Sequence, residues 1–273
     1  MKLCFSTLAS PDWNLQQIID HAVSSGVQGI DFRGIGAEID ITRLAEFNEP
    51  QLDITLARLR GAGLEMPCLN TSVTLVSPSA DRWQSMLDEC ARYAQLAEKT
   101  NTRYLRIFGG KVPKEMTRDE ARTMAQRHLR QLVKITRPSG CQVILETHDD
   151  WTTSDQVLEL LHEISPEDAG VLWDMEHPYR RGEPLLDTAH RLKRFIRHAH
   201  IKDSVRGEKG YEPRLLGEGD LPLKESIQAL RAIEYDGWLC LETEKRWYPE
   251  LAPDPQISIP QFANFMRDLL RRA

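Results

Sequence analysis

The chain has 273 residues, of which 41% are hydrophobic and 28% are charged, and its formal net charge is -6. This composition provides enough apolar material for a buried core and excludes an intrinsically disordered protein. The 35 basic residues are scattered along the chain rather than gathered into a tract, which argues against nucleic acid as a partner.

Short apolar runs, typical of buried strands, alternate along the chain with longer amphipathic stretches. The expected strands are Leu3–Leu8, Gly29–Arg33, Glu65–Thr71, Tyr104–Phe108, Gln142–Thr147, Gly170–Asp174, Arg197–Lys202 and Trp238–Thr243. The expected helices are Leu15–Ser24, Leu52–Arg60, Arg82–Lys99, Arg118–Thr136, Ser154–Glu163, Leu185–Phe195, Leu223–Ile233 and Ile259–Arg272. Eight strands, each followed by a helix, predict an α/β fold, the (β/α)8 TIM barrel, as a single domain over residues 1–273.

The connections between these elements support the barrel. An open, doubly wound sheet would show the same alternation, but no Gly-rich phosphate-binding fingerprint follows the first strand. Two long irregular stretches, Asp203–Asp220 and Arg246–Ser258, follow the seventh and eighth strands. Both are expected on the face where barrel enzymes have their active sites, and the first is long enough to be a lid or a binding loop.

The cysteines and the N-terminal segment indicate the expected cellular location of the protein. The cysteines Cys4, Cys68, Cys90, Cys141 and Cys240 include no Cys-x-x-Cys pair, so we expect reduced, buried thiols. The N-terminal sequence becomes polar within a few residues, so it lacks the apolar core of a signal peptide. No apolar run approaches the ~20 residues of a membrane span. We therefore expect a cytoplasmic protein with no membrane partner, and association into a homo-oligomer stays open.

Each of the last four expected strands ends in a side chain that can bind a metal ion. These residues are Glu146, Asp174, His200 and Glu242. Ionised carboxylates are almost never left unpaired in a core, so three of them beside a histidine need a shared counter-charge. One divalent cation would supply it. The donor set suits Mn²⁺, Mg²⁺ or Co²⁺ better than a thiolate-type zinc site, although Zn²⁺ stays among the candidates.

The alternative explanation is that these groups form salt bridges with inward-facing cations. Arg33, Arg106 and Lys202 are the candidates for such pairs. A single buried glutamate is usually structural, whereas four ligand-type residues at equivalent strand ends favour a metal site. We therefore prefer the metal.

Longer motifs surround the four residues. They are Leu-Glu146, Trp-Asp174-Met-Glu-His177, His198-Ala-His200-Ile-Lys202-Asp203, Leu-Gly217-Glu-Gly219-Asp220 and Gly-Trp238-Leu-Cys-Leu-Glu242. Together they resemble the sugar phosphate isomerase/epimerase family of xylose isomerase-like barrels, which includes the D-tagatose 3-epimerase group and inosose dehydratases. The resemblance covers nearly the whole chain. It implies that Glu146, Asp174, His200 and Glu242 bind the metal and that His177 and Arg206 contact substrate oxygens.

The expected chemistry is proton transfer at a carbon next to a carbonyl group. A metal that chelates a ketone oxygen and a neighbouring hydroxyl acidifies the C–H bond between them and stabilises the resulting enediolate. Glu146 and Glu242 are the expected base and acid. His148 follows Glu146 at the strand period, so it faces the same side and can orient a substrate hydroxyl. The predicted activity is that of a metal-dependent isomerase or epimerase of a small sugar or sugar phosphate, with no organic cofactor.

One position departs from the epimerases that act on free ketohexoses. That group usually has a second glutamate six residues after the first ligand, where this chain has Thr152. The turn between the two positions reads His148-Asp149-Asp150-Trp151. The difference leaves the metal ligands intact and the substrate open.

Three other functions fit parts of the pattern. A dehydratase acting on a cyclic keto-polyol would use the same metal and the same base, and it is the second candidate. A phosphodiesterase similar to endonuclease IV needs a multi-metal site with more histidines, and none occurs in the first four expected strands. A non-catalytic sugar-binding barrel would not need two carboxylates on opposite sides of a carbon.

Overall fold

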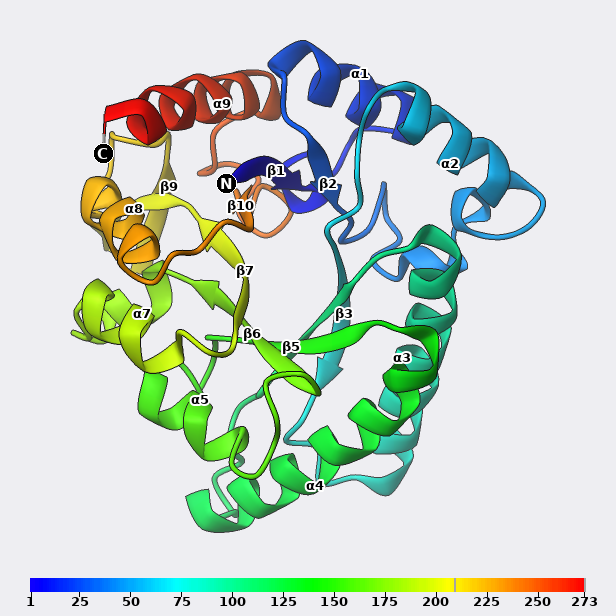
Figure 1. Cartoon of the computed structure of the whole chain (residues 1–273), viewed down its shortest axis with the longest axis vertical. Helices are drawn as coiled ribbons and strands as arrows, with labels where there is room; N and C mark the ends of the chain where they lie inside the picture. The colour runs from blue at the N-terminus through cyan, green and yellow to red at the C-terminus, as the bar shows by residue number, and fades with distance from the viewer. Residues whose placement is uncertain (209, 273) are drawn as a thin grey trace. The chain divides into compact units, whose positions relative to one another are not determined.

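The computed structural model describes residues 1–208 and 210–272. Eight parallel strands form one sheet in the order β2-β1-β10-β7-β6-β5-β4-β3 (Figure 1). The strands are β1 (Lys2–Ser6), β2 (Gly29–Asp31), β3 (Cys68–Thr74), β4 (Tyr104–Phe108), β5 (Gln142–Glu146), β6 (Ala169–Asp174), β7 (Ile196–Ile201) and β10 (Trp238–Leu241). Neighbouring strands in this sheet follow one another along the chain in a cyclic order, so the predicted (β/α)8 TIM-barrel fold is confirmed.

The chain groups by its internal contacts into two compact units, Met1–Pro67 with Ala199–Ala273 and Cys68–His198. The expectation of one domain over residues 1–273 stays a prediction. The first unit contains the helices α1 (Leu15–Ser25), α2 (Gln51–Gly61), α8 (Leu223–Ala232) and α9 (Pro255–Arg272), with short 3-10 helices η1 (Thr7–Ala9), η2 (Ile41–Arg43) and η3 (Ala45–Phe47). Helix α9 packs against α1 and α8. Strand β1 pairs with β10 from Lys2↔Trp238 to Phe5↔Leu241.

The second unit contains the helices α3 (Ala80–Thr100), α4 (Arg118–Thr136), α5 (Ser154–Leu160), α6 (Glu176–Arg180) and α7 (Leu185–Leu192), with the 3-10 helix η4 (Arg137–Ser139). Strand β4 pairs with β5 from Tyr104↔Gln142 to Phe108↔Glu146. Helix α3 packs against β3 and α4. Strands β5 and β6 are parallel neighbours. Their last residues, Glu146 and Asp174, therefore lie at the same edge of the sheet.

Local sequence explains the best-defined elements. Val143, Ile144 and Leu145 of β5 are fully buried, as expected for strands of a parallel sheet covered on both faces. Helix α4 begins with a capping box in which the side chains of Thr117 and Glu120 accept hydrogen bonds from each other's backbone N–H groups. This cap starts the helix at the predicted residue, Arg118.

The structure corrects several predicted boundaries and adds elements. The predicted strand Glu65–Thr71 begins at Cys68, because Pro67 has no N–H for the ladder. The predicted irregular loop Asp203–Asp220 contains an antiparallel hairpin of β8 (Asp203–Gly207) and β9 (Gly210–Arg214). Helix α6, which has only five residues, was not predicted.

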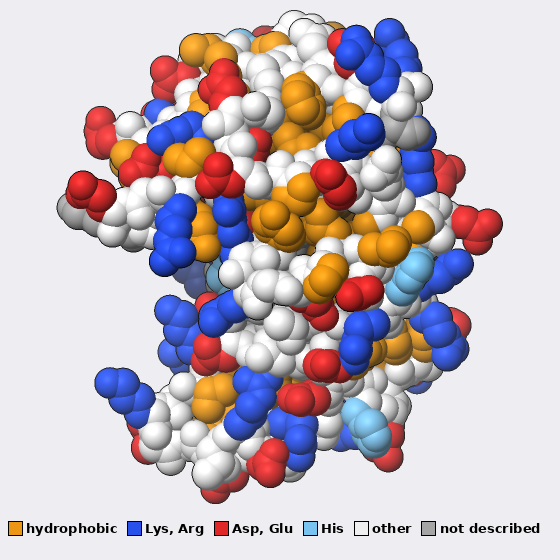
Figure 2. All heavy atoms as spheres, turned by 90° about the vertical axis from the view of Figure 1, so that its left-hand side faces the viewer, with side chains coloured by type: hydrophobic (Ala, Val, Ile, Leu, Met, Phe, Trp, Pro, Cys, Tyr) orange, Lys and Arg blue, Asp and Glu red, His pale blue; other side chains and the backbone are white. Residues whose placement is uncertain are grey.

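Surface features agree with the composition. On the face drawn in Figure 2, acidic and basic side chains are interspersed, so this face offers nucleic acid no continuous basic surface. All five cysteines are free and buried, as expected. In the described part of the chain, no helix combines the length and the apolar character that crossing a membrane requires.

Candidate metal centre

Glu146 ends β5 with its carboxylate buried in the second unit. The Nε atom of Arg106, on the neighbouring strand β4, lies 3.2 Å from Oε2 of Glu146. Both side chains are almost completely buried, with 1% of Arg106 and 2% of Glu146 exposed. Arg106 also donates a hydrogen bond from Nε to Oδ1 of Asn70 at 3.1 Å. The salt bridge considered as the alternative to a metal is therefore present at Glu146.

Asp174 ends β6, where the turn into α6 holds it. Its Oδ1 accepts a hydrogen bond from the backbone N–H of Glu176 at 3.0 Å. Its Oδ2 lies 3.4 Å from Nε2 of His177, because one helical turn brings a residue and its third successor to the same side. The hydroxyl of Thr147 accepts from the backbone N–H of Asp174 at 3.0 Å and donates to its carbonyl oxygen at 2.9 Å. These contacts fix the Asp174 carboxylate at the strand end.

The predicted substrate-binding residues His148 and His177 lie together in the same unit. Their rings meet edge to face with centroids 4.6 Å apart. One ligand-type atom of each lies within 4.8 Å of Glu146. Both rings are partly exposed, and Nδ1 of His148 lies 3.3 Å from the carboxylate of Asp149. Burial raises the pKa of Asp149, but the hydrogen bond and positive charge of His148 outweigh this effect and lower it below its usual value.

Thr152 is used within this same turn. Its hydroxyl donates a hydrogen bond to the carbonyl oxygen of Asp149 at 2.8 Å, and its side chain is buried. The backbone of Asp149 is left-handed, with φ of 53°. Thr152 therefore closes the turn after β5, where the sequence analysis noted the missing glutamate.

In the first unit, β7 and β10 bring His200 and Glu242 together. Cys240 on β10 pairs in register with His200, so Glu242, two residues later, stands beside the imidazole. Nδ1 of His200 lies 3.1 Å from Oε1 of Glu242, with the histidine fully buried. Nζ of Lys202 lies 2.9 Å from Oε2 of the same glutamate. Lys202 thus forms the second of the salt bridges considered in the sequence analysis. Arg33, the third candidate, donates to the carbonyl oxygen of Ile39 at 3.5 Å.

Asp31 was not predicted as a site residue. This residue ends β2 with no exposed surface, and its Oδ2 lies 3.8 Å from Nε2 of His200. The signal was available, because Asp31 is an acidic residue inside the expected strand Gly29–Arg33, and an acidic residue in a buried apolar run is unusual in itself.

Asp203 organises the hairpin that carries Arg206. Its carboxylate accepts hydrogen bonds from four backbone N–H groups at 2.8 to 3.1 Å, those of Ser204, Gly217, Gly219 and Leu221. The Leu-Gly-Glu-Gly-Asp motif therefore closes the base of the hairpin. Arg206 itself lies exposed on β8, and its backbone N–H donates to Oδ2 of Asp220 at 3.3 Å. Its contact with substrate stays a prediction.

Curated relatives match part of the chain. An inosose dehydratase of Geobacillus thermodenitrificans is 26% identical over 161 residues, which is 52% of this chain and 51% of that protein. An uncharacterized protein of Methanocaldococcus jannaschii is 26% identical over 125 residues, 42% of this chain and 41% of that protein. The chain thus matches about half or less of the length of these relatives.

Solved structures share the fold over the whole chain. The probable 3-DHS dehydratase AsbF of Bacillus anthracis has a TM-score of 0.80 and 22% identity, covering 98% of this chain and 99% of that one. The IOLI protein with a bound zinc atom has a TM-score of 0.82 and 17% identity, with 100% and 99% covered. A D-psicose 3-epimerase of Clostridium cellulolyticum H10 has a TM-score of 0.80 and 14% identity, with 99% of both covered.

The family follows from the sequence rather than from these distant structures. Residues 19–269 match the sequence model described as xylose isomerase-like TIM barrel, which includes all of the candidate site. The cyclic strand order agrees with this match. The chain belongs to the xylose isomerase-like TIM barrel family.

Proposed function

We propose that Glu146, Asp174, His200 and Glu242 bind one divalent metal ion and that the protein is an isomerase or epimerase of a small sugar or sugar phosphate. All four side chains are buried and of a type that binds metal ions, Glu146 and Asp174 in the second unit and His200 and Glu242 in the first. Their charges carry the proposal, because Arg106 and Lys202 contribute two positive charges against three buried carboxylates. A divalent ion is the counter-charge that such a donor set favours.

A bound divalent ion would act as a Lewis acid toward a substrate carbonyl group. Glu146 and Glu242 are the proposed proton carriers. Each is held by a cation on one oxygen, Glu146 by Arg106 and Glu242 by Lys202, so its position at the strand end is fixed before substrate arrives. One carboxylate removes a proton from the substrate carbon, and the other returns a proton from the opposite side. This exchange inverts the carbon, whereas return to the adjacent carbon would convert a ketose into an aldose.

His148 and His177 are the proposed contacts to substrate hydroxyls. They are partly exposed while the carboxylates beside them are buried, so they line the accessible side of this half of the site. An imidazole can donate from one nitrogen and accept at the other, which suits a hydroxyl group. Arg206, exposed on β8, is the proposed contact to a more distant oxygen or to a phosphate.

A dehydratase of a cyclic keto-polyol is the second candidate. The turn closed by Thr152 favours it, because no carboxylate stands at the position that the ketohexose epimerases use. The similarity to an inosose dehydratase points the same way. Such an enzyme would use the same proton abstraction and then expel a neighbouring hydroxyl group as water.

The test begins with protein purified without added metal and analysed for elements, in which we expect about one Mn, Mg, Co or Zn ion per chain. The metal-loaded protein is then incubated in deuterated water with ketoses, their phosphates and keto-polyols. Deuterium at one carbon without loss of water supports an isomerase or epimerase, and an enone product supports the dehydratase. Glu146→Gln and Glu242→Gln should each abolish exchange. Exchange that survives both changes would refute the assignment of the proton carriers.

A further inference from the structure

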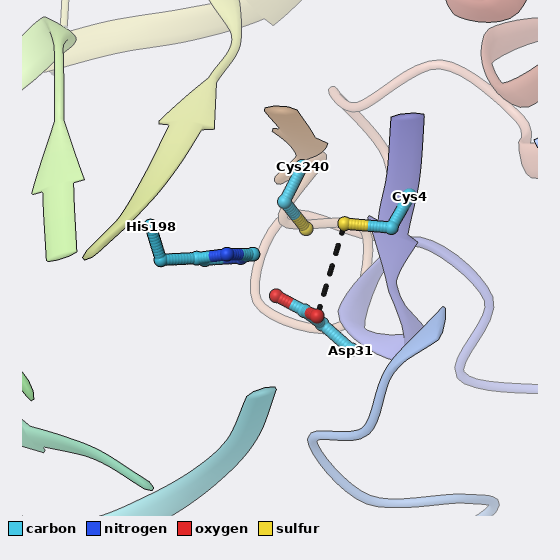
Figure 3. Close-up of side chains that lie close together, drawn as sticks. All are labelled: Cys4, Asp31, His198 and Cys240. Atoms are coloured by element: carbon cyan, nitrogen blue, oxygen red, sulfur yellow. Dashed lines mark hydrogen bonds between the residues drawn. The ribbon is translucent and has the colours of Figure 1, made fainter. Parts of the chain in front are cut away.

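A row of buried side chains leads away from His200 within the first unit. Asp31 on β2 lies between His200 and Cys4, with its Oδ2 3.8 Å from Nε2 of the imidazole and its Oδ1 3.8 Å from Sγ of Cys4. Cys240 on β10 is the register partner of Cys4 on β1. None of these four side chains has any exposed surface. Figure 3 shows Cys4, Asp31 and Cys240 pointing toward one another, with the contact between Cys4 and Asp31 dashed.

The two nitrogens of His200 face different groups. Nδ1 faces Oε1 of Glu242 at 3.1 Å, on the side of the proposed metal ligands. Nε2 faces Oδ2 of Asp31. An imidazole that binds a metal through one nitrogen usually donates its other N–H group to a carboxylate or a carbonyl oxygen, which fixes both the tautomer and the ring orientation. The distance of 3.8 Å is longer than a hydrogen bond, so the hydrogen bond requires Nε2 and Asp31 to lie closer together when a metal is bound.

Cys4 is suited to hold Asp31 in place. Burial raises the pKa of the Cys4 thiol to about 12, with the charge of Asp31 adding to the effect. The thiol therefore keeps its proton at neutral pH and can donate it to Oδ1 of Asp31.

We propose that Asp31 is a positioning residue, which accepts the Nε2–H group of His200 and so directs Nδ1 toward the metal, while Cys4 holds Asp31 from behind. This inference rests on the proposed function, since it assigns a role to Asp31 only if His200 binds a metal. It accounts for a buried carboxylate that is not one of the four ligands. It also commits His200 to one tautomer.

The first experiment measures metal affinity by titration calorimetry with Mn²⁺ and Co²⁺. Asp31→Asn should weaken binding about 10- to 100-fold while leaving one site per chain, the usual effect of changing such an outer partner. Asp40→Asn is the matched control, because Asp40 is also a buried aspartate of the first unit but contacts Thr42 and Arg43. Its affinity should equal that of the unchanged protein. The visible spectrum of bound Co²⁺ should change in Asp31→Asn and not in Asp40→Asn.

The outcomes separate the two proposals. If the unchanged protein binds no ion, the proposed function fails. If it binds one ion and Asp31→Asn binds equally well, Asp31 has no positioning role while the proposed function stands. Two Zn²⁺ ions per chain, with one lost in Cys4→Ser, would show that the thiols and Asp31 are a metal site of their own, which also overturns the inference.

A second measurement needs no change at Asp31 and covers the case in which Asp31→Asn does not fold. In nitrogen-15 spectra of the Zn²⁺-loaded protein, the His200 signals, assigned by their loss in His200→Gln, should show a proton on Nε2. A proton on Nδ1 would overturn the inference.

Discussion

Replacing Arg106 with methionine should destabilise the protein strongly. Arg106 and Glu146 are almost fully buried and lie 3.2 Å apart, so their attraction is about 5 kcal/mol at an effective dielectric constant of about 20. The cost of burying the two charges offsets much of this attraction while both are present. Methionine leaves the Glu146 carboxylate buried without that partner, and losses of about 3 to 5 kcal/mol follow when one member of a buried pair is removed.

The assay is urea unfolding of the metal-free protein followed by circular dichroism, with a double-mutant cycle. Glu146→Gln combined with Arg106→Met removes both charges, so the double variant should be more stable than Arg106→Met alone. Added Mn²⁺ should recover part of the loss in Arg106→Met, because the ion replaces the missing positive charge. A loss below about 1 kcal/mol in Arg106→Met would show that the pair contributes no more to stability than a surface salt bridge, and would refute the reasoning.

Three further results are expected. Chelation should lower the melting temperature, and the proposed metal should restore it; no change on chelation would contradict a tightly bound ion. Gly219→Ala should cost about 1 to 3 kcal/mol in urea unfolding, because its new methyl group would collide with the carboxylate of Asp203, whereas Gly61→Ala, a helical position with open space, should be neutral or stabilising. Burial lowers the pKa of His128, so the folded state binds fewer protons there and stability falls as pH drops below about 6.5. His128→Gln should therefore lose less stability than the unchanged protein between pH 7.5 and 5.5, and equal losses would contradict this.

Elements with strong local signals were predicted to the residue. Tyr104–Phe108 and Arg118–Thr136 agree with the structure at both ends, the latter because the capping box of Thr117 and Glu120 marks its start. The hairpin of β8 and β9 was missed because its strands contain few apolar residues and pair only with each other. Such pairing is a tertiary property, which a search for apolar periodicity does not detect.

The candidate site could be predicted from the sequence only where its residues carry a local signal. Glu146 and Asp174 were recognised because a carboxylate at the end of a buried apolar run is unusual in itself. The salt bridges of Arg106 and Lys202 were considered only as an alternative, and both exist, with Glu146 and Glu242. The contact of Asp31 with His200 joins residues that are far apart in the sequence, so the sequence alone does not reveal it. The role of the four residues as metal ligands stays a prediction.

The closure of the hairpin by Asp203 has a consequence for how this segment can evolve. One carboxylate fastens both ends of the segment, through Ser204 on one side and Gly217, Gly219 and Leu221 on the other. The stretch between these ends can therefore change in length and sequence while its anchorage persists, as surface loops commonly do. Since Arg206 on this stretch is the proposed contact to substrate, exchanging the stretch between related barrels would test its part in substrate choice while leaving Glu146 and Glu242 unchanged.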